Sequence, residues 1–175
     1  MRNISSTIAL TAILASSSAF ADPVQSSEDI INFFASAADQ GASRGICVGT
    51  EDECKGKAGA PVKTGLDMLV NFDLNSAALT PDAQAKLAEF AKALKDNRLK
   101  AHTFLVEGYT DASGTVPYND ALSERRAQSV TAYLLSSGIE ATRLKPIGMG
   151  ESHPRVANPY DPANRRVEMR INLQQ

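Results

Sequence analysis

The sequence predicts an α+β fold with two layers, in which a mixed sheet of about four strands carries its helices on one face. Two patterns support this prediction. Apolar and polar residues alternate over short stretches, as in half-buried strands. Between these stretches, apolar residues recur every three or four positions, as in amphipathic helices. The patterns follow one another in the order β-α-β-α-β-β with short connections, so the strands are expected to form one sheet on which the helices pack.

The first strand and the helix after it are expected between residues 68 and 94. Met68, Val70 and Phe72 lie at strand spacing. Thr80 is suited to cap the helix, and Pro81 is suited to its first position. One side of this helix is apolar and should pack on the sheet. The residues of this apolar stripe are Leu79, Ala83, Leu87, Phe90 and Leu94.

The rest of the body continues the alternation of strands and helices. A strand is predicted at 103–109, a helix from about 119 to 137 that Gly138 ends, and a third strand at 144–148. The last strand alternates, so one of its faces should be buried. Its apolar positions are Val167, Met169, Ile171 and Leu173, and its polar positions are Arg166, Glu168, Arg170 and Asn172.

A short helix is expected ahead of the body. Ser27 can cap it, and it should run to Asp39. Its apolar face comprises Ile30, Phe34, Ala37 and Ala38. Such a helix is not stable alone, because helices gain most of their stability from packing. It either docks on the body, which is the simpler interpretation, or offers Ile30, Phe33 and Phe34 to a protein partner.

The N-terminus has the features of a secretory signal peptide. Arg2 precedes an apolar run, and the triplet Ala-Phe-Ala at 19–21 fits a cleavage site. The run is interrupted by polar residues and is shorter than the roughly 20 residues that a membrane span needs. Cleavage after Ala21 would leave Asp22 first, with no cysteine to carry a lipid. We therefore expect an exported mature chain without a transmembrane segment.

A glycine-rich linker at 41–65 separates the short helix from the body and contains the only two cysteines, Cys47 and Cys54. In an oxidising compartment, two cysteines so close together are expected to form a disulfide. A metal pair is the alternative, but it would need two further ligands, and His102 and His153 lack ligand-like spacing. No metal or cofactor is therefore expected.

Composition and charge narrow the classes of function. The 175 residues are 43% hydrophobic and 22% charged, which is typical of a globular domain. With 18 basic and 20 acidic residues, nucleic acid and anionic membranes are not expected partners. A Gly-x-Ser-x-Gly pattern at 41–45 follows a predicted helix rather than a strand, so hydrolase activity is not expected.

The sequence divides into three predicted regions. They are a signal peptide at 1–21, a helix and linker at 22–64, and the body at 65–175.

Two charged residues of the body could form a ligand site. On a helical wheel that starts at Leu122, Arg126 lies at about 40° and Tyr133 at about 20°, inside the apolar stripe, whereas Arg125 lies toward its edge. A guanidinium facing a core requires an anion. That anion is either Asp111, at the end of the neighbouring strand, or the carboxylate of a ligand. The pattern leaves open whether Asp111 and Arg126 form a closed structural ion pair or a binding site.

Several ordered motifs occur together in the body. They are Phe72-Asp73-Leu74-Asn75-Ser76, Gly108-Tyr109-Thr110-Asp111, Tyr118-Asn119, Leu122-Ser123, Arg125-Arg126-Ala127, Gly148-Met149-Gly150-Glu151 and Asn164-Arg165-Arg166-Val167-Glu168. With this order and spacing, residues 65–173 resemble the OmpA-like peptidoglycan-binding domain family. The resemblance implies a periplasmic protein that binds meso-diaminopimelate, an amino acid of the stem peptide of peptidoglycan.

The resemblance also implies the roles of individual residues. Asp111 and Arg126 would hold the zwitterionic end of diaminopimelate, with Asp111 facing its ammonium and Arg126 its carboxylate. The other residues of the predicted site are Asn119, Asn75, Thr110 and Arg165. Such a site binds without catalysis, so no enzyme is expected. The alternative is a periplasmic protein-interaction scaffold with the same fold and no wall binding, because a fold does not determine a function. Either the chain is a free wall-binding factor, or its N-terminal helix recruits an envelope protein that places it near the outer membrane, and the sequence leaves both open.

Overall fold

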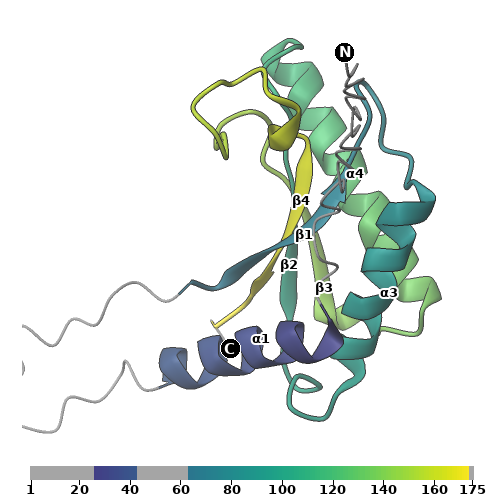
Figure 1. Ribbon diagram of the computed structural model, residues 1–175, viewed down its shortest axis with the longest axis vertical. Helices are drawn as coiled ribbons and strands as arrows, with labels where there is room; N and C mark the ends of the chain where they lie inside the picture. Colours follow the sequence, from purple (N-terminus) through teal and green to yellow (C-terminus); the bar gives the residue numbers. More distant parts are fainter. Residues whose placement is uncertain (1–25, 43–62, 174–175) are drawn as a thin grey trace, which may run out of the picture.

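The computed structural model describes residues 26–42 and 63–173, which form an α+β fold, as predicted (Figure 1). The predicted signal peptide and the predicted disulfide between Cys47 and Cys54 lie outside these residues. The elements are α1 (Ser27–Ala42), β1 (Gly65–Asn71), α3 (Pro81–Lys95), β2 (Phe104–Gly108), α4 (Val116–Ser136), the 3-10 helix η2 (Ala141–Arg143), β3 (Leu144–Gly148), the 3-10 helix η3 (Pro162–Asn164) and β4 (Arg166–Ile171).

Within the described residues, the sheet has four strands in the order β1-β4-β2-β3. β4 runs antiparallel to both β1 and β2, whereas β2 and β3 are parallel. The sheet is therefore mixed, as predicted. Helices α3 and α4 lie on one face of it (Figure 1). The register of β1 on β4 shifts between Asp67 and Val70, and such a bulge bends the strand and increases its twist.

The core lies between this face of the sheet and the helices. β4 contributes its predicted inward residues, Val167, Met169 and Ile171, all buried. Leu173 does not belong with them, because β4 ends at Ile171 and the Leu173 side chain is 40% exposed. The predicted stripe of α3 is confirmed for its four buried residues, Ala83, Leu87, Phe90 and Leu94, while Leu79 packs partly buried against the same core.

The ends of α3 show why the helix forms where the sequence predicts it. The Thr80 hydroxyl accepts a hydrogen bond from the N–H of Ala83 at 3.2 Å, and Pro81 occupies the first helical position. Pro81 has no N–H to leave unsatisfied there. At the other end, the guanidinium of Arg143 donates to the carbonyl oxygens of Leu94 and Leu99, each at 2.8 Å. The bond to Leu94 satisfies a carbonyl group in the last turn of α3, where helical N–H partners are lacking.

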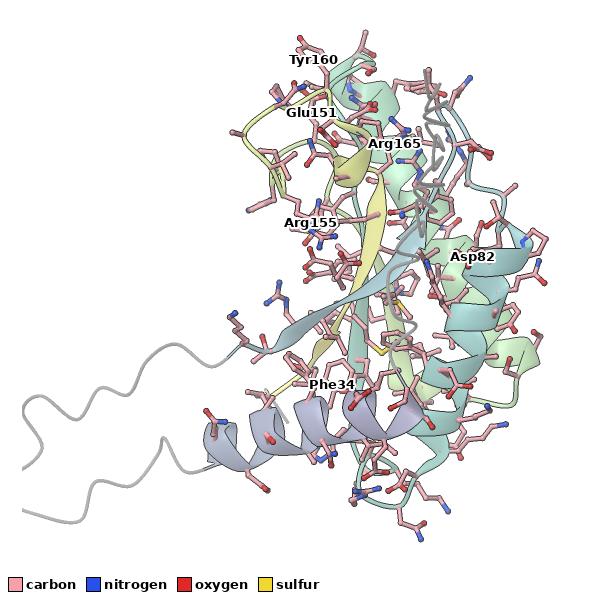
Figure 2. The ribbon with its side chains drawn as sticks, in the orientation of Figure 1. Phe34, Asp82, Glu151, Arg155, Tyr160 and Arg165 are labelled. Atoms are coloured by element: carbon pink, nitrogen blue, oxygen red, sulfur yellow. The ribbon has the colours of Figure 1, made fainter. Side chains whose placement is uncertain are left out.

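Helix α1 docks on the body rather than standing apart. Ile30 and Phe34 are fully buried, and Phe34 lies on the side of α1 that faces the sheet (Figure 2). The Phe34 ring meets the Phe104 ring edge-on with centroids 5.1 Å apart. The predicted cap is one residue too late. The N–H of Asp29 donates to the Ser26 hydroxyl at 3.2 Å and the N–H of Ser26 donates back to the Asp29 carboxylate at 3.3 Å, which is a reciprocal capping arrangement.

Helix α4 begins at Val116, three residues before the predicted start at Asn119. Thr115 and Pro117 mark this earlier start, although the Thr115 side chain makes no capping bond to the helix. The predicted end is confirmed: the helix ends at Ser136, and Gly138 adopts a φ of 90°. Glycine adopts this left-handed conformation at little cost.

Two glycines allow α4 to lie directly on the backbone of the sheet. Gly108 and Gly148 are paired in register at the ends of β2 and β3. A Cβ atom on Gly108 would lie 2.1 Å from the carbonyl oxygen of Ser123, and one on Gly148 would lie 2.7 Å from the Ser123 hydroxyl. Any larger residue would push the helix away. This close approach brings the first half of α4 to the end of β2, where the predicted site residues lie.

Candidate ligand-binding site

A pocket of about 320 Å³ lies where the end of β2, the first half of α4 and the turn between β1 and α3 meet. Its lining residues are Leu74, Asn75, Asp111, Ser113, Gly114, Tyr118, Asn119, Leu122, Arg126 and Arg165. Every predicted site residue except Thr110 is among them. The fold therefore brings together residues that are far apart in the sequence.

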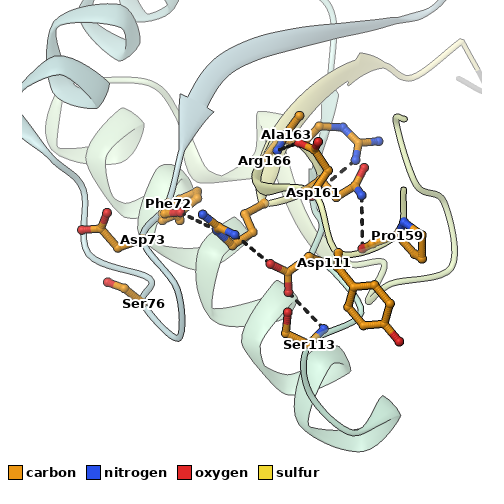
Figure 3. Close-up of polar contacts among 12 residues, drawn as sticks. Phe72, Asp73, Ser76, Asp111, Ser113, Pro159, Asp161, Ala163 and Arg166 are labelled. Atoms are coloured by element: carbon orange, nitrogen blue, oxygen red, sulfur yellow. Dashed lines mark hydrogen bonds and ion pairs between the residues drawn. The ribbon is translucent and has the colours of Figure 1, made fainter. Parts of the chain in front are cut away.

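Asp111 lies just beyond the end of β2 and is almost completely buried. Its Oδ2 accepts a hydrogen bond from Nη1 of Arg165 at 2.8 Å, and its Oδ1 accepts one from the N–H of Ser113 at 3.2 Å (Figure 3). Burial by itself would raise the pKa of Asp111, but these bonds outweigh it and hold the pKa below its ordinary 3.8. The carboxylate is therefore charged at neutral pH.

Arg126 is fully buried, as its place in the apolar stripe predicts. It does not form the closed ion pair with Asp111 that the sequence leaves open. Its three nitrogens instead donate to main-chain carbonyl oxygens: Nε to Ser76 at 2.9 Å, Nη1 to Tyr109 at 2.9 Å and Nη2 to Asp73 at 3.2 Å. A guanidinium has five N–H groups, so these three bonds leave two for other acceptors.

Burial lowers the pKa of Arg126 to about 10, and the nearby charge of Arg165 contributes to the shift. Arg126 is therefore still protonated at neutral pH. The ring of Phe72 helps to stabilise it, since the guanidinium carbon lies 5.1 Å from the ring centroid. With one carboxylate, Asp111, and two guanidiniums, Arg126 and Arg165, the pocket carries an excess of positive charge that favours a ligand with an anionic group.

Arg165 connects Asp111 to the turn after β1. Its Nε donates to the carbonyl oxygen of Phe72 at 3.0 Å, while its Nη1 binds Asp111. Arg126 and Arg165 thus hold the same turn, which contributes Leu74 and Asn75 to the pocket wall. Asn75 has a φ of 57°, a left-handed conformation that asparagine tolerates better than most residues. The turn is therefore shaped by the two arginines and by one permissive residue.

Asn119 lies in the wall of the pocket, whereas Thr110 lies behind it. Asn119 is buried in the pocket wall, and its Nδ2 donates to the carbonyl oxygen of Asp111 at 3.2 Å and to the Glu151 carboxylate. Thr110 lies behind the pocket, where its N–H donates to the carbonyl oxygen of Gly150 at 2.9 Å. Its hydroxyl is buried without a hydrogen-bond partner among the described residues. Thr110 thus contributes to the structure around the site rather than to the pocket surface.

The long connection between β3 and β4 positions Arg165. Asn164, fully buried, fastens this connection: its Oδ1 accepts from the N–H of Arg155 at 2.8 Å, and its Nδ2 donates to the carbonyl oxygen of Asn158 at 2.9 Å. The next residue, Arg166, stacks over the Tyr109 ring with its guanidinium carbon 3.9 Å from the centroid. Figure 2 shows Arg165 and Glu151 at this end of the molecule, far from Phe34.

Sequence reasoning missed half of the residues that line the pocket. The residues it did not assign to the site are Leu74, Ser113, Gly114, Tyr118 and Leu122. One signal was available, because Tyr118 and Leu122 are one helical turn apart and therefore share a side of α4 with Arg126. Leu74 had no such signal, since its place depends on a turn held by distant residues.

Two further observations concern residues 26–42 and 63–173 only. No helix within these ranges is long and apolar enough to cross a membrane. Their His, Asp and Glu residues do not gather in any group of three or more that could hold a metal ion.

Comparison with known proteins places this chain in a family. Residues 71–168 match the OmpA family. The chain belongs to the OmpA family. Among OmpA relatives, outer membrane protein A of Escherichia fergusonii is 44% identical over 103 residues, which is 59% of this chain and 42% of the relative. Outer membrane protein A of Klebsiella pneumoniae is 41% identical over 103 residues, which is 29% of that protein's length. The chain therefore spans less than half the length of these relatives.

Solved structures of OmpA-like domains share the fold. The OmpA-like domain of FopA1 from Francisella tularensis has a TM-score of 0.55 at 27% identity, over 62% of this chain and 73% of that one. The peptidoglycan-associated lipoprotein of Burkholderia pseudomallei has a TM-score of 0.51 at 27% identity, over 62% of this chain and 88% of that one. The periplasmic domain of MotB from Helicobacter pylori, at 23% identity, has a TM-score of 0.54 over 63% and 75% and shows likeness of fold alone.

Proposed function

We propose that this protein binds peptidoglycan non-covalently in the periplasm, through the diaminopimelate residue of the stem peptide. The observation that carries the proposal is the pocket, which presents one buried carboxylate and two guanidiniums in a space of about 320 Å³. That volume is at the low end of the roughly 300 to 1,000 Å³ of small-molecule pockets, so it suits one amino acid rather than a sugar chain.

The charges of the pocket complement the free end of diaminopimelate. Its ammonium would lie against Asp111, whose carboxylate is bonded to Arg165 and Ser113. A carboxylate has about four acceptor sites, so it can accept a further bond from the ligand. Its carboxylate would lie against Arg165, the more exposed guanidinium, and against the two unused N–H groups of Arg126 beneath it. Bidentate bonds of this kind are among the stronger hydrogen bonds in proteins.

The comparisons support the setting of the proposal. One structural neighbour is named a peptidoglycan-associated lipoprotein, and the curated relatives are named outer membrane protein A. The predicted signal peptide supports export to the periplasm, where the wall lies. The proposed role is reversible binding, since a carboxylate and two guanidiniums already paired with the protein serve recognition without a chemical step.

An envelope protein partner remains a prediction. The N-terminal helix buries Ile30 and Phe34 in the core, and Phe33 packs against the same core. A partner would therefore have to bind the outer face of α1, which carries polar residues such as Asn32 and Ser36.

Sedimentation with purified peptidoglycan sacculi tests the proposed function. Wild-type protein should pellet with the sacculi, and soluble meso-diaminopimelate should release it. Asp111→Asn keeps the shape of the side chain but removes the charge that faces the ammonium. Binding should weaken at least about thirtyfold, the lower end of the roughly 2 to 5 kcal/mol expected when one partner of a buried charge pair is lost.

Asp82→Asn is the matched control for that variant. Asp82 is an exposed carboxylate on α3, away from Arg165 and Glu151 (Figure 2). This variant should pellet as wild type does. Wild-type protein that stays in the supernatant would contradict the proposal and favour the alternative, a scaffold that binds proteins and not the wall.

A further inference from the structure

The rim of the pocket is apolar and exposed, in contrast to its charged floor. Leu74 is 64% exposed and Tyr118 is 40% exposed, although both line the pocket. Asp111 and Arg126, which line the same pocket, are almost or completely buried. A ligand that reaches the charged floor from solvent therefore passes these two apolar side chains, and covering them removes apolar surface from water.

Tyr118 is held in place by its surroundings. Its ring packs against the backbone of Gly114, where a Cβ atom would lie 2.9 Å from Cδ1 of the tyrosine. The guanidinium carbon of Arg125 lies 6.0 Å from the ring centroid. Leu122 continues the apolar wall one helical turn further along α4, where it is buried. The ring is therefore already oriented before a ligand arrives, which lowers the entropy cost of binding.

Leu74 comes from the other side of the fold. The residues on either side of its turn, Asp73 and Ser76, accept hydrogen bonds from Arg126 through their carbonyl oxygens. The same guanidinium that lines the floor of the pocket thus holds the turn that carries its apolar rim. An apolar rim built from two separate elements above a charged floor suits a ligand with a charged end and an aliphatic stem.

We propose that Leu74, Tyr118 and Leu122 form an apolar slot that binds the aliphatic spacer of the diamino acid and selects ligands by the length of that spacer. This inference rests on the proposed function and adds to it a means of selecting among ligands. The charged floor recognises the amino-acid end, which every free amino acid has. The slot distinguishes a ligand with a spacer of several methylene groups from one without.

Competition with sacculi for the full chain tests the slot. The probes are free meso-diaminopimelate, norleucine and alanine, and norleucine and alanine differ only in the length of an aliphatic chain. Each buried methylene group strengthens binding about fourfold. Norleucine should therefore release wild-type protein at a concentration at least about tenfold lower than alanine does.

Variants of the slot residues test which side chains give the preference for norleucine over alanine. Leu74→Ser and Tyr118→Ser should each reduce the norleucine-to-alanine preference about fourfold, which corresponds to one buried methylene group. Tyr118→Phe keeps the ring and should retain the preference. Leu135→Ser is the matched control, because Leu135 is similarly exposed at 38% but lies in the last turn of α4.

The outcomes separate the two proposals. Wild-type protein that does not sediment overturns the proposed function and the slot together. Wild-type protein that sediments but is released equally by norleucine and alanine overturns the slot alone. So does a Tyr118→Phe variant that loses as much preference as Tyr118→Ser, because the hydroxyl and not the ring would then carry the effect. A ratio of two competitors measured on one variant is insensitive to loss of folded protein, so an unstable variant still gives an answer.

Discussion

At the scale of single residues, the two arginines of the pocket have both structural and binding roles. Arg126 joins three carbonyl oxygens that come from the turn after β1 and from the end of β2. Arg165 joins the carbonyl oxygen of Phe72 to the carboxylate of Asp111. The pocket wall and the pocket floor therefore depend on the same two side chains.

Arg126→Ala should lower the free energy of unfolding by about 3 kcal/mol or more, because it leaves buried carbonyl groups without donors. Arg126→Lys should restore little, since one ammonium lacks the planar fork that reaches acceptors in two segments. Urea denaturation measures the free energy of unfolding of both variants. Arg125→Ala is the control: Arg125 is exposed, so its loss should change stability by no more than about 0.5 kcal/mol. Equal effects of the two alanine variants would contradict this account.

Asp111 gives a prediction for pH. Its folded pKa lies below the ordinary 3.8, so its charged form stabilises the folded state above that value, and the contribution is lost as the pH falls through the folded pKa. The melting temperature of Asp111→Asn should therefore lie below that of wild type by a constant amount from pH 7 to about pH 5. The difference should shrink below about pH 4. A difference that stays constant down to pH 2 would show that the Asp111 charge does not contribute.

At the scale of elements, the seating of α4 on the ends of β2 and β3 determines the geometry of the site. The N–H of Gly150 donates to the Ser123 hydroxyl at 2.9 Å, and the N–H of Gly148 donates to the Glu124 carboxylate at 2.8 Å. These bonds tie the helix to the sheet at the level of Gly108. Asn119 and Arg126, on the same helix, are thereby brought against Asp111.

Gly108→Ala should be strongly destabilising, by about 3 kcal/mol or more, because its Cβ would lie 2.1 Å from a backbone oxygen of α4 and the helix cannot retreat without unpacking. It should also weaken binding in the sacculus assay, since α4 carries part of the pocket. Gly65→Ala is the control, because the nearest atoms there are 3.3 Å away and belong to the Arg170 side chain rather than to backbone, so a small shift would accommodate the Cβ atom. Similar melting temperatures for the two variants would rule out the close packing inferred here.

At the scale of the whole molecule, α1 and the pocket lie at opposite ends of β2. Phe34 meets Phe104, the first residue of that strand, whereas Asp111 follows its last residue. Helix α1 lies outside the residues that match the OmpA family, yet it closes the same core. A substitution in α1 should therefore lower the stability of the protein without weakening its binding to peptidoglycan.

Phe34→Ala removes a fully buried aromatic side chain and should lower the free energy of unfolding by about 3 to 5 kcal/mol. Binding to sacculi, measured well below the melting temperature, should stay within about twofold of wild type, since sites so distant are usually independent. Phe33→Ala, at a partly buried position, should cost less. Loss of binding in a folded Phe34→Ala protein would show that α1 supports the pocket.

The sequence by itself determined the features that depend on neighbouring residues. The order and type of the elements, the cap at Thr80, the end of α4 near Gly138 and the inward face of α4 at Arg126 all follow from periodicity and local hydrogen bonding. The motifs also indicated half of the residues that line the pocket. Only the tertiary structure decided their partners. Arg126 binds carbonyl oxygens 17, 50 and 53 positions away, Arg165 rather than Arg126 pairs with Asp111, and Leu74 joins the rim. A helical wheel shows which way a side chain faces, but its acceptors come from distant segments whose positions are set by packing of the whole chain.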